Sequence, residues 1–218
     1  MTFMEEAIER AMPLWKDAAN EPFLDELGRG TLDRKKFYEY IVQDSIYLRD
    51  YLKAFAMAMF KSRTIKEMQV FYSLLGYVND GENVTRLKYL ADFGMTDADV
   101  DKTEKKPACA AYTKFLIDTA VNEDVPEILM AVMPCMLGYK YVFDTTLARH
   151  PEVKDTYFAP LVADYTADFY TECCEFWTAH CNEVCGGITG ARREKLIELF
   201  RLASAHELYF WQMAGGKR

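Results

Sequence analysis

The chain has 218 residues, half of them hydrophobic and 14% aromatic, which predicts a single domain over residues 1–218 with a sizeable apolar core. Its formal net charge of −8 argues against non-specific nucleic-acid binding, because such binding needs a basic surface. No apolar run reaches the roughly 20 residues of a membrane-spanning helix, and the glutamates among the first twelve residues are atypical of a signal peptide.

Apolar residues recur with helical period along nearly the whole chain, and glycine and proline divide this pattern into segments. In chain order we predict helices at residues 5–19, 31–62, 64–78, 82–93, 107–120, 126–150, 161–184 and 190–213, with a short turn at 23–27. Thr31 or Asp33 is expected to cap the second helix, and Asn79-Asp80-Gly81 to stop the third. Residues 95–106 and 151–160 are expected to be connections. Because no segment alternates like a strand, we predict an all-α, single-domain helical bundle.

The helix at residues 126–150 is predicted to be the central one, since residues 128–139 carry no charge and a helix without a polar face is buried. Cys135 and Tyr139 are four residues apart, so they lie on one face, a turn from each other. Pro134 removes one backbone hydrogen bond and is expected to kink the helix beside the thiol. That thiol either faces a cavity or is an inert core cysteine, because free cysteine is commonly buried.

Two carboxylates fall where the helical pattern expects apolar side chains. Asp44 is centred on the aromatic stripe of the helix at 31–62, and Glu207 on the apolar stripe of the helix at 190–213. An unpaired buried charge is costly, so each should be paired, protonated or facing a polar pocket. Two structural explanations stay open: Asp44 bonds to a neighbouring helix, or Glu207 pairs with Arg192 or Arg193.

Four tyrosines are also predicted to point inward, and each taken singly is an ordinary core aromatic: Tyr47, Tyr112, Tyr139 and Tyr165. Together with two inward acids and a central thiol they suit a flat, nitrogen-containing ring. The aromatic faces would stack on such a ring, and the acids would accept hydrogen bonds from its N–H groups.

We expect no cofactor and no metal. The histidines are His150, His180 and His206, so no Glu-x-x-His pair supports a di-iron centre, and no helix before His150 offers a histidine to haem. The sequence also contains no glycine-rich phosphate loop and no Gly-x-Ser-x-Gly motif.

The cysteines are the remaining metal-binding side chains to consider. Cys174, Cys181 and Cys185 share one helical stripe, near Cys173 and His180. Zinc ligands usually come from turns and separated segments, which favours core or interface thiols here. All six cysteines fall within helical patterns, which indicates reduced thiols in a cytoplasmic protein.

Residues 23–33, Phe37 and residues 40–48 resemble the N-terminal signature of the TenA/thiaminase II family. The resemblance continues at Tyr112, Pro134-Cys135 with Tyr139, Tyr165 with Asp168-Phe169, and Glu207 with Phe210-Trp211, so it covers nearly the whole chain. It implies a haem-oxygenase-like helical fold without haem, and a homotetramer. It also implies hydrolysis of a 4-amino-2-methylpyrimidine that carries a leaving group on its 5-methylene, which yields hydroxymethylpyrimidine for thiamin salvage. The leaving group would be an amine or the thiazolium of thiamin.

The resemblance assigns a role to each site residue. Cys135 would be the nucleophile that adds to the ring carbon next to N1, so that the 5-methylene can expel its substituent. Glu207 would bind or protonate N1, and its burial favours the protonated acid. Asp44 would accept from the 4-amino group and sit at N3. Of the remaining residues, Tyr47, Tyr112 and Tyr165 would orient the ring, Tyr139 would position water, and Phe210 would stack on the ring.

Some positions depart from the family pattern. Leu161 stands where the family has tryptophan, and Tyr141 where it often has glutamate, which bears on substrate preference or a tetramer contact. No lysine or histidine lies in the turn before Cys135, so activation of the thiol must come from elsewhere in space. Two alternatives remain: a non-catalytic pyrimidine-binding or regulatory module on the same fold, and a cofactor-free oxidoreductase resembling pyrroloquinoline-quinone synthase. The scarcity of histidine counts against the second.

Overall fold

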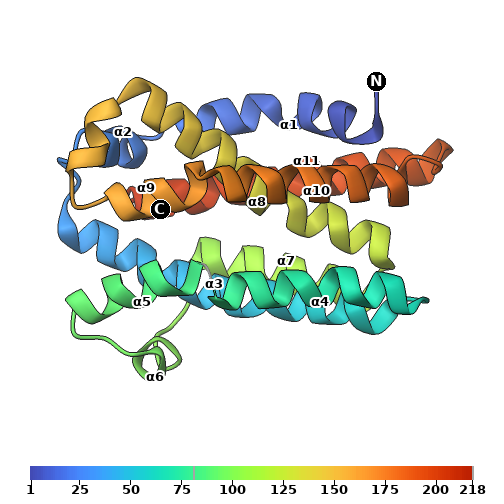
Figure 1. Cartoon of the computed structure of the whole chain (residues 1–218), viewed down its shortest axis with the longest axis horizontal. Helices are drawn as coiled ribbons and strands as arrows, with labels where there is room; N and C mark the ends of the chain where they lie inside the picture. Colours follow the sequence, from blue (N-terminus) through green and yellow to red (C-terminus); the bar gives the residue numbers. More distant parts are fainter. Residues whose placement is uncertain (81, 218) are drawn as a thin grey trace. The chain divides into compact units, whose positions relative to one another are not determined.

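The structure is a computed structural model that describes the backbone of residues 1–80 and 82–217 and the side chains of residues 1–73 and 84–217. Its elements in chain order are α1 (Phe3–Ala19), α2 (Pro22–Gly28), α3 (Arg34–Lys61), α4 (Ile65–Asp80), α5 (Glu82–Asp92), α6 (Asp97–Val100), α7 (Pro107–Asn122), α8 (Val125–Arg149), the 3₁₀-helix η1 (Pro151–Asp155), α9 (Ala159–Thr166), α10 (Asp168–Cys185) and α11 (Gly190–Ala214) (Figure 1). Strands are absent from the described residues, which confirms the all-α prediction. None of the described helices is both long and apolar enough to cross a membrane.

The chain divides into two compact units. Unit 1 consists of Met1–Leu32 with Leu129–Arg218, and unit 2 is Asp33–Ile128. One boundary falls at the start of α3 and the other inside α8. The structure defines the internal arrangement of each unit, so the single domain over residues 1–218 stays a prediction.

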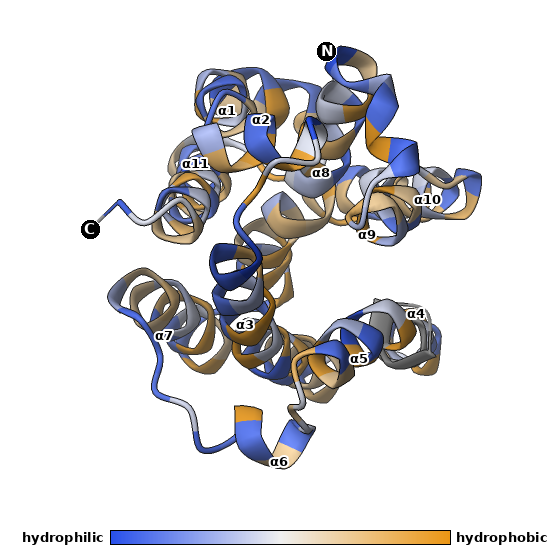
Figure 2. Ribbon diagram, turned by 90° about the vertical axis from the view of Figure 1, so that its left-hand side faces the viewer, coloured by the Kyte–Doolittle hydropathy of each residue, from blue (hydrophilic) through white to orange (hydrophobic). Residues whose placement is uncertain are grey.

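Unit 2 is built around α3, which packs against α7 on one side and against α4 and α5 on the other (Figure 2). Asp33 begins the helix: its carboxylate accepts from the backbone N–H of Lys35 at 2.7 Å and of Lys36 at 3.2 Å. These bonds satisfy two of the N–H groups that a helix leaves without partners at its start. Asp33, and not Thr31, therefore caps the helix.

Unit 1 packs α1 against α10 and α11. The indole N–H of Trp15 in α1 donates to the hydroxyl of Ser204 in α11 at 3.1 Å. The same indole covers Gly138 of α8, where an added Cβ would lie 3.5 Å from its Nε1. Trp15 therefore contacts two helices of the unit at once. Within unit 1, α8 and α11 run in the same direction, as the colour gradient in Figure 1 shows.

Most predicted helices are present with ends shifted by a few residues, but the single helix predicted at 161–184 is wrong. It is two helices, α9 and α10, because Ala167 between them is extended, with φ −64° and ψ 149°. An alanine is no helix breaker, and the apolar periodicity continues from one side of Ala167 to the other. The sequence pattern therefore predicted one helix.

Three smaller differences concern segments predicted as turns or connections. Residues 23–27 belong to the helix α2, and the segment 151–160 holds η1 and the start of α9. The connection 95–106 holds α6, which begins where Asp99 accepts from the backbone N–H of Thr96 at 3.0 Å and from its hydroxyl at 2.6 Å. The helix α8 continues through Pro134. The predicted stop at Asn79-Asp80-Gly81 includes Gly81, which lies outside the described residues.

Candidate functional site

The predicted site residues are all buried, at 9% exposure or less. Unit 2 contains Asp44, Tyr47 and Tyr112, and unit 1 contains Cys135, Tyr139, Tyr165, Glu207 and Phe210. The spacing argument therefore predicted correctly that the two carboxylates and the thiol point away from solvent.

In unit 2 the packing of α7 on α3 brings the predicted ring-binding residues together. The ring centroids of Tyr47 in α3 and Tyr112 in α7 are 4.8 Å apart, and Tyr51 extends this contact at 5.7 Å from Tyr47. Asp44 precedes Tyr47 by three residues and so lies on the same face of α3. A carboxylate beside tyrosine rings can accept N–H groups from a flat ring that stacks on those aromatics.

In unit 1 an aromatic cluster made of Tyr139, Tyr165 and Trp211 joins three helices. The ring of Tyr139 in α8 lies 5.0 Å from that of Tyr165 in α9 and 4.9 Å from that of Trp211 in α11. Cys135 is one turn before Tyr139, and Glu207 is one turn before Trp211. Because α8 and α11 run in the same direction, stepping back one turn from this contact leads to the thiol on one helix and to the carboxylate on the other.

Tyr165 is held by contacts that depend on the break between α9 and α10. Its ring stacks on Phe143 with centroids 4.8 Å apart and an interplanar angle of 5°. It also meets Tyr170 edge-on at 5.1 Å, and the hydroxyl of Tyr170 donates to the carbonyl of Met136 in α8 at 3.1 Å. Residues on both sides of the break thus pack against α8, which places Tyr165 beside Tyr139.

The proposed pairing of Glu207 with Arg192 or Arg193 is wrong. All three residues lie on α11, and Glu207 follows Arg193 by fourteen positions and Arg192 by fifteen, which corresponds to at least about 21 Å of helix. Arg193 instead pairs with Glu6 at 2.8 Å and lies 4.8 Å over the ring of Phe3. Arg193 therefore joins α11 to α1, and neither arginine lies close enough to Glu207 to neutralise its carboxylate.

The structure holds all six cysteines as thiols. Burial raises the pKa of Cys109 to about 12 and that of Cys181 well above its usual value, so both stay protonated at neutral pH. Both are fully buried, whereas Cys135 keeps 9% of its surface exposed. Cys174, Cys181 and Cys185 are buried on α10, and the described residues contain no group of three or more metal-binding side chains that could hold an ion.

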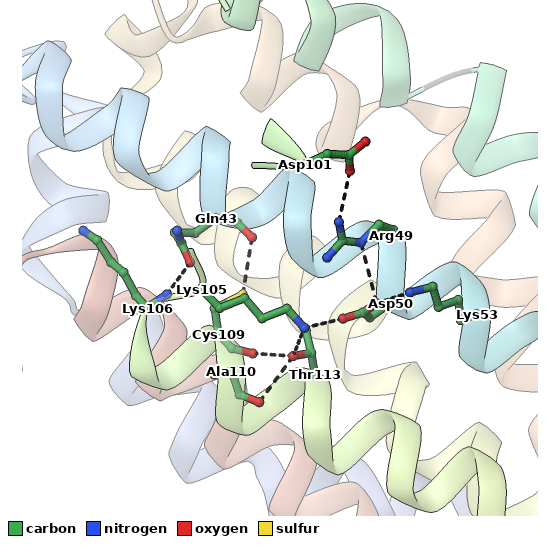
Figure 3. Close-up of polar contacts among 10 residues, drawn as sticks. All are labelled: Gln43, Arg49, Asp50, Lys53, Asp101, Lys105, Lys106, Cys109, Ala110 and Thr113. Atoms are coloured by element: carbon green, nitrogen blue, oxygen red, sulfur yellow. Dashed lines mark hydrogen bonds and ion pairs between the residues drawn. The ribbon is translucent and has the colours of Figure 1, made fainter. Parts of the chain in front are cut away.

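Helical spacing did not single out Asp50, a second buried carboxylate of α3 that lies one turn beyond Tyr47. Asp50 is 5% exposed and accepts from the ammonium groups of Lys105 at 2.5 Å and Lys53 at 2.8 Å (Figure 3). Burial favours its neutral form, but these bonds outweigh burial and hold its pKa below the usual value. Stepping three residues on from Tyr47 would have found Asp50, but not its partner Lys105.

The two departures from the family pattern lie in unit 1. Leu161 is buried in α9. Tyr141 is half-buried in α8, with its ring centroid 5.9 Å from that of Trp15. A tyrosine at this position therefore takes part in the contact of α8 with α1, where a shorter carboxylate would leave the indole less covered.

Comparison with known proteins gives concordant results. The model of the TENA/THI-4/PQQC family matches residues 8–217. The chain is 27% identical over 219 residues to the aminopyrimidine aminohydrolase of Halalkalibacterium halodurans, which covers 100% of this chain and 97% of that protein. The TenA homologue of P. horikoshii superposes with a TM-score of 0.85 at 23% identity over 99% of both chains. A Shewanella denitrificans domain with a haem-oxygenase-like fold superposes with a TM-score of 0.75 at 13% identity, over 98% of this chain and 92% of that one. This similarity confirms the expected fold.

Proposed function

Because the chain belongs to the TENA/THI-4/PQQC family, we propose that it is an aminopyrimidine aminohydrolase with thiaminase II activity, acting in thiamin salvage. It hydrolyses 4-amino-2-methylpyrimidines that carry a leaving group on the 5-methylene, and releases hydroxymethylpyrimidine. The main structural support is in unit 1, where the buried thiol of Cys135 and the buried carboxylate of Glu207 each lie one turn from the contact between Tyr139 and Trp211. The name of the Halalkalibacterium halodurans relative adds to this support.

We propose that the substrate ring is bound by residues of both units. Asp44 accepts a hydrogen bond from the 4-amino group and sits at N3, and Tyr47 and Tyr112 form an aromatic wall beside it. From unit 1, Tyr165 orients the ring and Phe210 stacks on it. This arrangement would fix the ring carbon next to N1 within reach of the Cys135 thiol, which lowers the entropic cost of the first step.

The reaction then proceeds by covalent catalysis. The thiol of Cys135 gives up its proton, to the departing amine or, when the thiazolium leaves, to solvent, and its sulfur forms a bond to the ring carbon next to N1 while N1 takes a proton from Glu207. The electron pair of the ring expels the amine or thiazolium from the 5-methylene, which becomes an exocyclic double bond. Water positioned by Tyr139 adds to that methylene. Loss of the N1 proton to Glu207 and cleavage of the C–S bond restore the aromatic ring and the acid, and the departing sulfur takes the proton that the added water released, which restores the thiol.

The proposal is tested by giving the purified protein thiamin and aminomethylpyrimidine separately and identifying the product by mass. We expect hydroxymethylpyrimidine from at least one substrate, and the ratio of the two kcat/KM values gives the preference. The kcat of the Cys135→Ser variant should be at least about a thousandfold lower than that of the wild-type protein, because its hydroxyl is a far weaker nucleophile. Cys173→Ser is the matched control, since Cys173 lies on α10 and is half-buried.

Circular dichroism of both variants establishes that they are folded. Turnover by Cys135→Ser close to that of the wild-type protein would remove Cys135 from the role of nucleophile. Tight calorimetric binding of the pyrimidine without any product after long incubation would instead support the non-catalytic binding or regulatory module.

We further propose that the protein is a cytoplasmic homotetramer. Its reduced cysteines suit that compartment. Three aromatic side chains of unit 1 are exposed, namely Phe169 at 60%, Phe176 at 51% and Tyr209 at 53%, and exposed aromatic groups are typical of subunit contacts. Sedimentation should then give about four times the 25.2 kDa of one chain, and a monomeric mass would reject the tetramer.

A further inference from the structure

Three successive residues ahead of α7, Glu104, Lys105 and Lys106, are hydrogen-bonded to two side chains of α3. The side-chain amide of Gln43 donates to the carbonyl of Glu104 at 3.0 Å. It also accepts from the backbone N–H of Lys106 at 2.8 Å, as Figure 3 shows. Between these two bonds, the ammonium group of Lys105 reaches Asp50 at 2.5 Å. One side chain of α3 thus holds the backbone of this segment, and another holds its side chain.

The same contacts continue into the first turns of α7. The ammonium group of Lys105 also donates to the hydroxyl of Thr113 at 2.8 Å, and that hydroxyl donates to the carbonyl of Cys109 at 2.9 Å. The thiol of Cys109 in turn lies 3.6 Å from the carbonyl of Gln43. Lys105 is therefore bound to a residue of α3 and a residue of α7 at once, which fixes how far α7 can slide along α3.

The residues that make these bonds lie next to the predicted site residues of unit 2 along α3 and α7. Gln43 directly precedes Asp44, and Asp50 follows Tyr47 by three residues on α3. On α7, Thr113 directly follows Tyr112. The contact between Tyr47 and Tyr112, at 4.8 Å, thus lies between the bonds made by Gln43 and those made by Asp50.

We propose that Gln43, Asp50 and Lys105 form a clamp that positions Asp44, Tyr47 and Tyr112 for binding of the pyrimidine ring. This inference rests on the proposed function. The clamp residues act through their neighbours, so they are positioning residues and not catalytic ones. Because the clamp holds only the unit 2 part of the site, its loss should weaken binding of the ring much more than it slows the chemical step.

The test compares Asp50→Asn with the wild-type protein in three measurements. These are the Kd of hydroxymethylpyrimidine by calorimetry, the KM and kcat of hydrolysis, and the hydrogen-exchange rate of the backbone amides of residues 108–113 without ligand. We expect Kd and KM to rise about tenfold, since a lost charge-assisted hydrogen bond is worth about that much, while kcat stays within about threefold. Amide exchange in α7 should become faster.

Asp118→Asn is the matched control, because Asp118 is an exposed residue of α7 that pairs with Lys114 on the same helix. It should leave all three measurements unchanged. Faster amide exchange in Asp50→Asn with an unchanged Kd and KM would show a purely structural role and overturn the proposal. An equal loss in kcat and in binding would overturn it as well.

Lys105 provides a second pair of variants in case Asp50→Asn does not fold. Lys105→Gln leaves Asp50 paired with Lys53, yet removes the link to Thr113, so Kd should again rise about tenfold. Lys105→Arg keeps the charge and the donors and should restore most of the affinity. A wild-type protein that neither binds nor converts the pyrimidine would instead refute the proposed function, and the role of the clamp with it.

Discussion

The thiols of this chain differ widely in burial, although all are the same functional group. The thiolate is the reactive form of cysteine, and an apolar environment disfavours it. Cys109 and Cys181 have no exposed surface and a raised pKa, whereas Cys173 is half-buried. Cys135, the proposed nucleophile, lies between these cases.

We predict that iodoacetamide at pH 8 spares Cys109 and Cys181 in the folded protein. With a pKa of about 12, roughly one Cys109 side chain in ten thousand is a thiolate at that pH, and this fraction grows only as the pH rises toward the pKa. Peptide mapping by mass spectrometry measures the modification. In guanidinium chloride all cysteines should react, and fast modification of Cys109 in the native protein would contradict its burial.

Helical spacing predicted individual buried residues well where the residues one turn before and one turn after them are aromatic or apolar. Asp44 and Glu207 are 5% and 4% exposed, as their places on the stripes indicated. Asp50 is just as buried, but its environment comes from Lys105, which lies in a connection more than fifty residues away. Spacing within one helix contains no information about such a partner.

At the scale of elements, the end of α2 is fixed by a close approach to the residue that precedes η1. A Cβ added at Gly28 would lie 2.5 Å from Cδ2 of His150. The imidazole cannot easily move away, because its ring nitrogens lie 2.9 Å from a carboxylate oxygen of Asp25 and 3.3 Å from one of Glu152. Gly28 is therefore required by packing.

We predict that Gly28→Ala lowers the free energy of unfolding by about 2 kcal/mol, since overpacking of a closed site forces neighbours to shift. Urea unfolding followed by circular dichroism measures the change. Gly187→Ala is the control, because nothing lies within 4 Å of the Cβ that it would add. It should change the stability little, and equal effects of the two substitutions would show that Gly28 is not packed as described.

Element boundaries were predictable where a side chain sets them. Asp33 caps α3 and Pro107 begins α7, and both residues stand out in the sequence. The break at Ala167 could not be foreseen, because its extended backbone accompanies the packing of Tyr165 and Tyr170 in unit 1. Local propensity gives no warning when tertiary contacts decide.

At the scale of the whole molecule, the sequence was sufficient for the fold class and the family. Helical periodicity without strand patterns predicted the all-α architecture, and the ordered blocks of similar residues indicated the family that the model match establishes. The assembly of the site is a different matter. Asp44 belongs to unit 2 and Cys135 and Glu207 to unit 1, and all three are far apart in the chain, so no spacing rule relates them.

The proposed reaction requires that one pyrimidine ring touch residues of both units, and a crystal structure with bound hydroxymethylpyrimidine measures this directly. We predict that Asp44 accepts from the 4-amino group, that Glu207 lies at N1, and that the sulfur of Cys135 faces the adjacent ring carbon. A ring bound against one unit alone, or in a cavity without Cys135, would refute the proposed site and its mechanism.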